Sequence, residues 1–569
     1  MDIRKAMEYS IIYLDGAMGT MVQRAGLKAG HPPEIYNMTN PDVILSIHRA
    51  YLQAGADVIT TNTFGANQYK LANTGYTVEE VVEKAVSIAR EAAGERWVAL
   101  DIGPVGQLME PSGSLTFEEV YESVARQVRV GADSGADLVI IETLTDIYEA
   151  KAAVLAAKEN SSLPVFCTLT FDKSGRTLMG TDPLTAVTIL EALGVDALGV
   201  NCSLGPKDLL PIIEEFLKYS HVPVIAQPNA GLPKLENGET KFEMSPEEFA
   251  QYAKQMVDKG VRVIGGCCGT SPEFIEAVRK ATSDANPLLI NNERITAASS
   301  SSKTVVLGRA FKIIGERINP TGKEDMAKAL KEKDFYYIVD EAIEQREAGA
   351  DILDVNVCIS DIDEKETMVQ AIREIQSMVN IPLQIDSTDP EVIEAAVRIY
   401  NGKPIINSVS GTKASMEAIF PIAKKYGTCL IALTLDEKGI PASAEERFEI
   451  AANIVDEAEK WGISRENIII DCLVLTASNN QREAMETLKA IELVKKELKT
   501  PTILGISNVS YGLPNRSLLN RTYLAMALAM GLDAAILNPL DRNIIETLHA
   551  FKVLSGSERD IKEYIKLYK

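Results

Sequence analysis

The feature that most constrains the fold is a repeat of short apolar runs, rich in Val and Ile, each followed by a longer stretch with helical periodicity. This alternation is typical of βα units around a parallel sheet. The first half of the chain contains eight such runs, at 11–15, 57–61, 97–101, 137–142, 164–170, 197–201, 223–227 and 262–266. After a break the pattern restarts, with eight runs at 312–316, 350–355, 382–386, 404–408, 429–435, 467–471, 501–507 and 534–538.

Eight repeats match one (β/α)8 barrel, whose usual length is roughly 250 residues. We therefore predict an α/β chain of two tandem (β/α)8 barrels, with a first domain at 1–283, a Ser-rich linker at 284–308 and a second domain at 309–569. A pair of open, doubly wound sheets would show the same periodicity. No GxGxxG or GxxxxGK[ST] phosphate loop follows any run, which favours the barrels.

Composition narrows the environment and the partners. The 569 residues include 80 acidic and 58 basic side chains, for a net charge of −22, so we expect neither nucleic acid nor an anionic membrane as a partner. No stretch approaches the roughly 20 apolar residues of a membrane span, and the first residues lack the apolar core of a signal peptide. Seven cysteines, an odd number in a long chain, argue against a disulfide framework. We expect a cytoplasmic protein.

In a (β/α)8 barrel the functional residues lie at the C-terminal ends of the strands. Three cysteines fall there in the first barrel, with Cys202 after the sixth run and Cys267 and Cys268 after the eighth. Three thiolates suit a soft, tetrahedral metal such as zinc, with a fourth position left open. The glycines that flank the CC pair would let the backbone bring both sulfurs to one ion. We interpret the other four cysteines as buried fillers: Cys167, Cys358, Cys429 and Cys472.

Such a site favours thiol alkylation over hydrolysis. Three thiolates make zinc a poor Lewis acid for carbonyls, but the ion still deprotonates a fourth thiol near neutral pH. Hydrolytic zinc sites more often use His and carboxylate ligands, and none of the four histidines falls at a predicted strand end of this barrel. The residues therefore predict a zinc-held thiolate that acts as a nucleophile.

The segments LDGAMGT, TTNTFGAN, NCS and GGCCGT resemble the zinc-dependent homocysteine S-methyltransferase family, and the resemblance covers the whole first barrel. It implies one zinc ion held by the three cysteines, with the homocysteine sulfur as the fourth ligand. It also implies that Asp15, Gly16 and Glu142 hold the amino and carboxylate groups of the amino acid. By the same resemblance, Asn229 would be a weak ligand of the zinc ion that homocysteine displaces. The residues alone leave two alternatives open, a capping role for Asp15 and a solvated rim carboxylate for Glu142.

The strand ends of the second barrel carry Asp and Asn and no cysteine cluster. The aspartates are hydrogen-bond acceptors, and the asparagine amides both donate and accept. A flat heterocycle with a guanidine-like edge, such as a pterin, would satisfy this set. Each residue alone would more often be a capping or turn group. The set comprises Asp386, Asp471, Asn319, Asn356, Asn407 and Asn508.

The segments IIGERINPTG, DVNV, QIDS, INSVSG and GISNVSYGLPNR resemble the pterin-binding methyltetrahydrofolate methyltransferases over roughly residues 310–569. The resemblance implies that Asp386, Asn407 and Asp471 bind the pterin. It places Asn508 near the pterin N5 atom, so Asn508 and Asp471 are the catalytic candidates. Arg516 would meet the folate tail or a partner if it does not bind the pterin. The further candidates for folate binding on this rim are Glu316, Asn319 and Arg516.

One chain with both barrels in this order resembles the N-terminal part of the cobalamin-dependent methionine synthase family. The resemblance implies two methyl transfers, from 5-methyltetrahydrofolate to cob(I)alamin on the second barrel and from methylcobalamin to zinc-bound homocysteine on the first. The DxHxxG motif of the family's corrinoid-binding module is absent from this sequence, so another domain or protein would carry the cobalamin. The alternatives are a homocysteine S-methyltransferase fused to a methylenetetrahydrofolate reductase-type barrel, a double-barrel scaffold that stores folate or zinc, and a dihydropteroate synthase.

Overall fold

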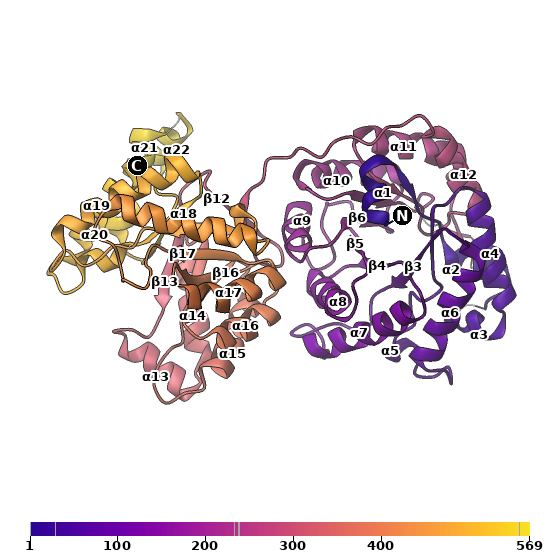
Figure 1. The fold of residues 1–569 in the computed structure, drawn as a ribbon, viewed down its shortest axis with the longest axis horizontal. Helices are drawn as coiled ribbons and strands as arrows, with labels where there is room; N and C mark the ends of the chain where they lie inside the picture. The colour runs from indigo at the N-terminus through magenta and orange to yellow at the C-terminus, as the bar shows by residue number, and fades with distance from the viewer. Residues whose placement is uncertain (1, 29, 233, 237–238, 557) are drawn as a thin grey trace. The chain divides into compact units, whose positions relative to one another are not determined.

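The computed structural model describes residues 2–569 except 29, 233, 237–238 and 557. The chain divides between Glu293 and Arg294 into two compact units (Figure 1). Each unit contains eight parallel strands surrounded by helices, so the prediction of two tandem (β/α)8 barrels is confirmed. Each predicted apolar run overlaps one barrel strand, although several strands are shorter than the run.

The first barrel has a sheet of eight parallel strands. The sheet closes where Leu14 bridges Val58 and the Asp57 backbone N–H donates to the Tyr13 carbonyl at 2.8 Å. The strands are β1 (Ile12–Tyr13), β2 (Val58–Thr60), β3 (Trp97–Ile102), β4 (Leu138–Leu144), β5 (Val165–Leu169), β6 (Ala197–Asn201), β7 (Val224–Gln227) and β10 (Val263–Ile264). Strands β6, β7 and β10 are neighbours, which brings Cys202 and the CC pair to one side of the barrel.

Helices enclose this barrel and also cover its N-terminal end. Helix α1 (Ile3–Tyr9) lies across one end of the barrel (Figure 1). Its Ile3, Ala6 and Met7 side chains are buried in one cluster with residues at the strand starts and with Phe166. The other helices are α2 (Met18–Arg24), α3 (Tyr36–Thr39), α4 (Pro41–Gln53), α5 (Gln68–Leu71), α6 (Val78–Ala93), α7 (Phe117–Asp133), α8 (Ile147–Asn160), α9 (Pro183–Ala192), α10 (Pro206–Tyr219), α11 (Pro246–Lys259) and α12 (Pro272–Ala281), with a 3-10 turn at Pro33–Ile35 and a hairpin of β8 (Lys234–Glu236) and β9 (Glu239–Lys241).

The second barrel is closed by hydrogen bonds all the way round. Its strands are β13 (Lys312–Ile318), β14 (Ile352–Val355), β15 (Leu383–Asp386), β16 (Ile405–Ser410), β17 (Cys429–Leu433), β18 (Ile468–Asp471), β19 (Thr502–Gly505) and β20 (Ala534–Leu537). Its α-helices are α13 (Glu324–Glu332), α14 (Phe335–Glu347), α15 (Glu364–Met378), α16 (Pro390–Ile399), α17 (Lys413–Tyr426), α18 (Ala444–Lys460), α19 (Gln481–Leu493), α20 (Arg516–Ala529), α21 (Arg542–Ser555) and α22 (Glu558–Tyr568). Among the described helices of both units, none combines the length and apolar character that a membrane crossing requires.

The linker predicted at 284–308 is wrong over its second part. Residues 296–307 contain an antiparallel hairpin, β11 (Thr296–Ser299) and β12 (Thr304–Leu307), which belongs to the second unit. Ala298, Val305 and Leu307 are buried against the starts of the barrel strands. The Ser300 hydroxyl donates to the Asn380 carbonyl at 2.8 Å. The Ser-rich composition is typical of a linker, but here small side chains let a hairpin pack against the barrel.

Helix α4 carries a histidine, His48, that is completely buried, and neither of its ring nitrogens has a hydrogen-bond partner among the described residues. Burial lowers the pKa of His48 from 6.5 to about 4. Between these two values the unfolded chain binds more protons than the folded chain. The free energy of unfolding of the first barrel should therefore fall as the pH drops from about 6.5 to about 4.

We expect His48→Leu to remove this acid sensitivity. Relative to wild type, the variant should gain about 2–3 kcal/mol of stability on going from pH 7 to pH 4.5, because all other titrating groups cancel in the difference. The measurement is urea unfolding followed by Trp97 fluorescence in a Trp461→Phe background, since each barrel contains one of the two tryptophans. An equal stability difference at both pH values would show that His48 does not titrate as proposed.

Candidate functional site

The three predicted cysteines of the first barrel lie together. The Sγ atoms of Cys202, Cys267 and Cys268 are all within 4.8 Å of one another, and those of Cys202 and Cys268 are 3.8 Å apart. A tetrahedral ion with metal–sulfur bonds of roughly 2.3 Å holds its sulfur ligands about 3.8 Å apart. No cysteine in the described structure forms a disulfide. The donor atoms and their spacing therefore fit a single soft metal ion.

The charges of this cluster also favour a cation. Hydrogen bonds from the thiols of Cys267 and Cys268 lower the pKa of Cys202. The same contact with Cys202 raises the pKa of Cys267 well above its usual value. Without a metal, the two thiols thus stabilise a single thiolate at Cys202 by donating to it. All three cysteines can be thiolates together only when a positive ion neutralises their mutual repulsion.

The local backbone aims the sulfurs at one point. Cys202 and Ser203 both adopt left-handed φ angles, 62° and 60°, which cost non-glycine residues roughly 1–2 kcal/mol each. Gly269 follows the CC pair with φ of 84°, as its predicted role requires. Gly266 serves close packing instead, because an added Cβ would lie 2.5 Å from the Thr270 hydroxyl oxygen.

A cavity of about 220 Å³ opens beside the cysteines at the C-terminal ends of the strands. The predicted substrate residues Asp15, Gly16 and Glu142 line it together with all three cysteines. Asn229 is not among the lining residues, but it is buried and its side chain hydrogen-bonds to Cys202. The structure therefore brings the predicted residues of the first barrel to one place.

Asp15 does not cap the following helix. Helix α2 has Ala17 at its N-cap and no side-chain capping bond. Instead, the carboxylate of Asp15 accepts from the Thr60 backbone N–H at 2.8 Å and from the Thr60 hydroxyl at 3.1 Å. Burial raises the pKa of Asp15 to about 8. Asp15 is thus a fixed carboxyl group at the edge of the cavity.

Glu142 lines the cavity and precedes a residue with a strained backbone. Thr143 has a φ of 64°, which is a genuine outlier for a β-branched residue. Its backbone N–H donates to Asn201 Oδ1 at 2.9 Å, and Glu142 Oε2 accepts from Gln227 Nε2 at 3.2 Å. Burial raises the pKa of Glu142 to about 7. This environment is unlike that of a solvated rim carboxylate.

Sequence reasoning gave no role to the residues that position this site. Thr60 orients Asp15, Gln227 orients Glu142, and Asn201 fixes the Thr143 turn through both atoms of its amide. Each residue stands at the end of an otherwise apolar run. A polar residue in that position indicates a side chain at the functional end of the barrel, and this signal was available in the sequence.

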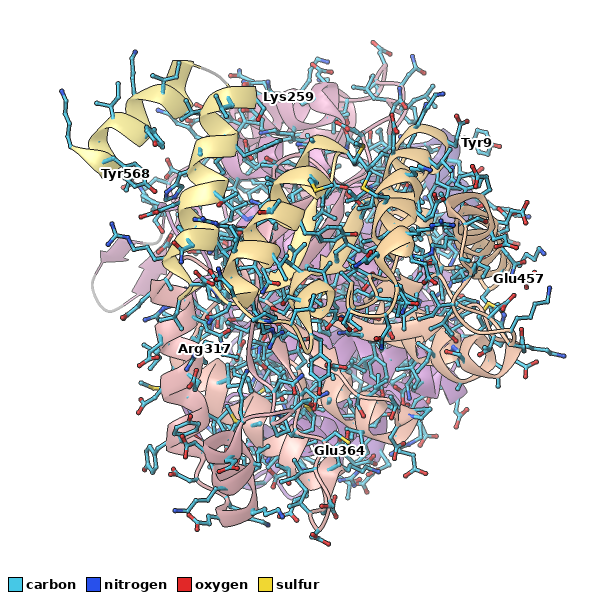
Figure 2. The ribbon with its side chains drawn as sticks, turned by 90° about the vertical axis from the view of Figure 1, so that its left-hand side faces the viewer. Tyr9, Lys259, Arg317, Glu364, Glu457 and Tyr568 are labelled. Carbon is cyan, nitrogen blue, oxygen red and sulfur yellow. The ribbon has the colours of Figure 1, made fainter. Side chains whose placement is uncertain are left out.

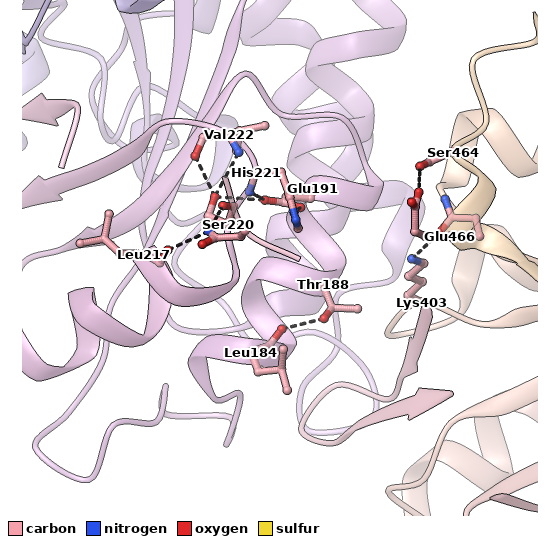
Figure 3. Close-up of polar contacts among 12 residues, drawn as sticks. Leu184, Thr188, Glu191, Leu217, Ser220, His221, Val222, Lys403, Ser464 and Glu466 are labelled. Carbon is pink, nitrogen blue, oxygen red and sulfur yellow. Dashed lines mark hydrogen bonds and ion pairs between the residues drawn. The ribbon is translucent and has the colours of Figure 1, made fainter. Parts of the chain in front are cut away.

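Histidine takes no part in the described metal cluster. His221 precedes β7, at the opposite end of the strand from the cysteines. Its Nδ1 atom lies 3.0 Å from Glu191 Oε2 of α9, and this contact links the start of β7 to a neighbouring helix (Figure 3). His221 is therefore a structural residue.

In the second barrel, the predicted residues on β15 and β16 each hydrogen-bond to a polar side chain from β14 or the loop that follows it. Asp386 accepts from Asn356 Nδ2 at 3.0 Å and pairs in register with Asn407 on the neighbouring strand. Asn407 lies 3.5 Å from Asp354, a buried carboxyl that also accepts from Gln384 at 2.6 Å. Burial raises the pKa of Asp386. Sequence reasoning placed Asp354 at a strand end without giving it a role, and it missed Gln384; both support this rim.

Asp471 ends β18 and is held by the loop that follows it. Its Oδ1 atom accepts from the Leu473 backbone N–H at 2.7 Å, and burial raises its pKa to about 7. The fully buried guanidinium of Arg447 donates to the carbonyls of Cys472 and Leu473 at 2.8 and 2.6 Å. Arg447 therefore fixes the loop that orients Asp471.

Asn508 is exposed on a 3-10 turn at Ile506–Ser510, and two other predicted residues contact this turn. Glu316 accepts from the Ser507 hydroxyl at 2.8 Å. Arg516 donates to the Ser507 carbonyl at 2.8 Å. Glu316 and Arg516 thus support the segment that carries Asn508.

Asn319 has a local role, because its Oδ1 atom accepts from the Thr321 backbone N–H at 2.9 Å. Arg317 beside it, labelled in Figure 2, forms a two-pronged ion pair with Glu341 at 2.6 Å.

The prediction that Cys358 is a buried filler is wrong, since it is exposed in the loop after β14. The other three are buried as predicted: Cys167, Cys429 and Cys472.

Comparisons with known proteins agree with this division. Residues 12–282 match the family model described as homocysteine S-methyltransferase, and residues 315–538 match the model described as pterin binding enzyme. The methionine synthases of Mycobacterium leprae and Mycobacterium tuberculosis are each 31% identical to the chain, over 94% of its length and 48% of theirs. The chain therefore spans about half the length of these curated relatives.

Among solved structures, a metallated homocysteine methyltransferase from Escherichia coli is 25% identical, with a TM-score of 0.42, and the match covers 48% of this chain and 96% of that one. The two family matches follow the two barrels closely. The two barrels thus match two different family models, that of homocysteine S-methyltransferases in the first and that of pterin binding enzymes in the second.

Proposed function

We propose that the chain catalyses two methyl transfers in the synthesis of methionine. The second barrel transfers the methyl group of 5-methyltetrahydrofolate to cob(I)alamin, and the first transfers the methyl group of methylcobalamin to homocysteine. The observation that carries the proposal is the cluster of three thiols beside an acidic cavity, in a chain that also contains a pterin-family barrel. Because the two substrates would bind to different compact units, the proposal requires a corrinoid-binding domain or protein as methyl carrier.

Zinc is the metal that we propose for Cys202, Cys267 and Cys268. When bound, zinc would lower the pKa of the homocysteine thiol and so supply a thiolate near neutral pH. The buried Oδ1 atom of Asn229, which has no hydrogen-bond partner among the described residues, supports its role as the weak ligand that the substrate displaces. Asp15 and Glu142 would hold the substrate ammonium, with Gly16 beside them at the cavity wall.

In the second barrel, Asp386, Asn407 and Asp471 would bind the pterin ring. The aspartates would accept from its N–H edge, and the amide of Asn407 would meet its carbonyl and ring nitrogens. Asn508 would lie near N5, where a proton is required because an unprotonated amine is a very poor leaving group. Asp471, with a pKa near 7, can hold such a proton at neutral pH. Glu316, Asn319 and Arg516 would complete the rim.

The family match of the second barrel supports this function over the alternative of a fused methylenetetrahydrofolate reductase-type barrel. A preparation that contained FAD and oxidised a nicotinamide cofactor would reverse that preference. We place the protein in the cytoplasm, since its free thiols persist in a reducing compartment.

The test measures the two half-reactions separately. The zinc-loaded chain should form methionine from homocysteine and free methylcobalamin, and should demethylate 5-methyltetrahydrofolate in the presence of cob(I)alamin. If zinc binds at one ion per chain but methylcobalamin stays unreacted, the methyl donor is different. If neither substrate reacts, the chain is a binding scaffold and the proposed function is wrong.

A further inference from the structure

The cavity of the first barrel contains a carboxylate that the proposed function has not used. Asp101 lies on β3, lines the cavity and is only 6% exposed. Its backbone is fixed, because its N–H donates to the Thr61 hydroxyl at 3.1 Å and its carbonyl accepts from the Thr63 hydroxyl at 2.7 Å. Its Oδ1 atom is buried and has no hydrogen-bond partner among the described residues. A buried carboxylate oxygen without a donor is unfavourable unless a ligand supplies one.

The other carboxylates of the cavity already have donors. Asp15 accepts from the backbone and the hydroxyl of Thr60. Glu142 accepts from Gln227, and Glu34 accepts from the Gly65 backbone N–H. Among the described lining residues, Asp101 is thus the carboxylate with a buried oxygen to spare.

The charges of the cavity call for a cationic ligand group. Four carboxylates line it, and no Lys or Arg is among its described lining residues. Burial and the nearby carboxylates of Glu142 and Asp15 raise the pKa of Asp101 well above its usual value, and the Lys70 ammonium behind the cavity wall opposes this only in part. A positive group that entered between these carboxylates would relieve their repulsion and return Asp101 to its ionised form.

We propose that Asp101 binds the α-ammonium group of the thiol substrate directly and makes the site specific for an amino acid over a simple thiol acid. The inference rests on the proposed function, because the thiol end of the substrate is assigned to the cysteines. An ammonium has three N–H donors, and Asp15, Asp101 and Glu142 offer one carboxylate to each. Without the ammonium, a substrate carboxylate would meet only like charge.

The test compares two ligands that differ by the amino group, homocysteine and 4-mercaptobutyrate. Their dissociation constants are measured on the Co²⁺-loaded full chain, from the absorption band that appears when a thiolate binds the metal. Asp101→Asn should weaken homocysteine binding by roughly 10–100-fold, because it removes a charged hydrogen bond to the ammonium. The same variant should not weaken 4-mercaptobutyrate binding, because that ligand has no ammonium and its carboxylate would meet one like charge fewer.

Asp101→Ala should give the same pattern, which guards against a new hydrogen bond from the asparagine amide. Asp133→Asn, on the exposed end of α7, is the matched control and should leave both ligands unaffected. Equal losses for the two ligands, or no loss for homocysteine, would overturn the role of Asp101 alone. If the wild-type chain binds no homocysteine at its metal, the proposed function fails together with this inference.

Discussion

Replacing Cys267 by serine is expected to lower the affinity of the chain for its metal ion by roughly 10²–10³-fold and to abolish methyl transfer to homocysteine. A four-ligand thiolate-type zinc site is worth roughly 10–16 kcal/mol, so one ligand accounts for about 2.5–4 kcal/mol. A serine hydroxyl stays protonated at neutral pH and replaces a soft sulfur by a hard oxygen. The remaining thiols, Cys202 and Cys268, lie 3.8 Å apart and would hold the ion from one side only.

The measurement is competition for zinc against a chelator of known affinity, followed by methionine formation from methylcobalamin. Cys358→Ser is the matched control, because Cys358 is an exposed thiol outside the cluster, and it should retain one zinc ion per chain. The folate half-reaction should be unchanged in Cys267→Ser, since the second barrel is a separate compact unit. A Cys267→Ser chain that kept wild-type zinc affinity would show that the ion binds elsewhere.

The barrels could be predicted from sequence because every buried parallel strand needs a short apolar run, and the runs are spaced by helices of regular length. The cysteine cluster was accessible for a related reason. Once Cys202 and Cys267 are assigned to strand ends, barrel geometry brings those ends to the same rim. Both inferences depend on local pattern and a closed topology, and neither needs side-chain detail.

The features that escaped prediction depend on contacts between distant segments. The Ser-rich hairpin at 296–307 has the composition of a linker, and only the barrel end that covers Ala298 and Leu307 makes it structured. Thr60 orients Asp15 from a different strand. The spare oxygen of Asp101 becomes evident only when the donors around its neighbours are counted. No periodicity in the sequence carries this information.

The second large effect is expected at Asp386 in the pterin barrel. Asp386→Asn should weaken binding of 5-methyltetrahydrofolate by roughly 30–1,000-fold, or about 2–4 kcal/mol. This is the usual effect of removing the charged acceptor from two buried hydrogen bonds. The replacement amide presents a donor to the N–H edge of the pterin, where the carboxylate presents two acceptors. It also disturbs Asn356, whose Nδ2 atom donates to Asp386 at 3.0 Å.

Asp361→Asn is a suitable control because that side chain is 81% exposed in the loop before α15, and asparagine tolerates its φ of 70°. Folate affinity is measured by titration calorimetry, and the rate of demethylation with cob(I)alamin is measured on the same protein. Methionine formation from methylcobalamin should stay at the wild-type rate, since Asp386 belongs to the second barrel. Unchanged folate affinity in Asp386→Asn would move the pterin away from β15, whereas a parallel loss of methionine formation would mean that the two barrels do not work independently.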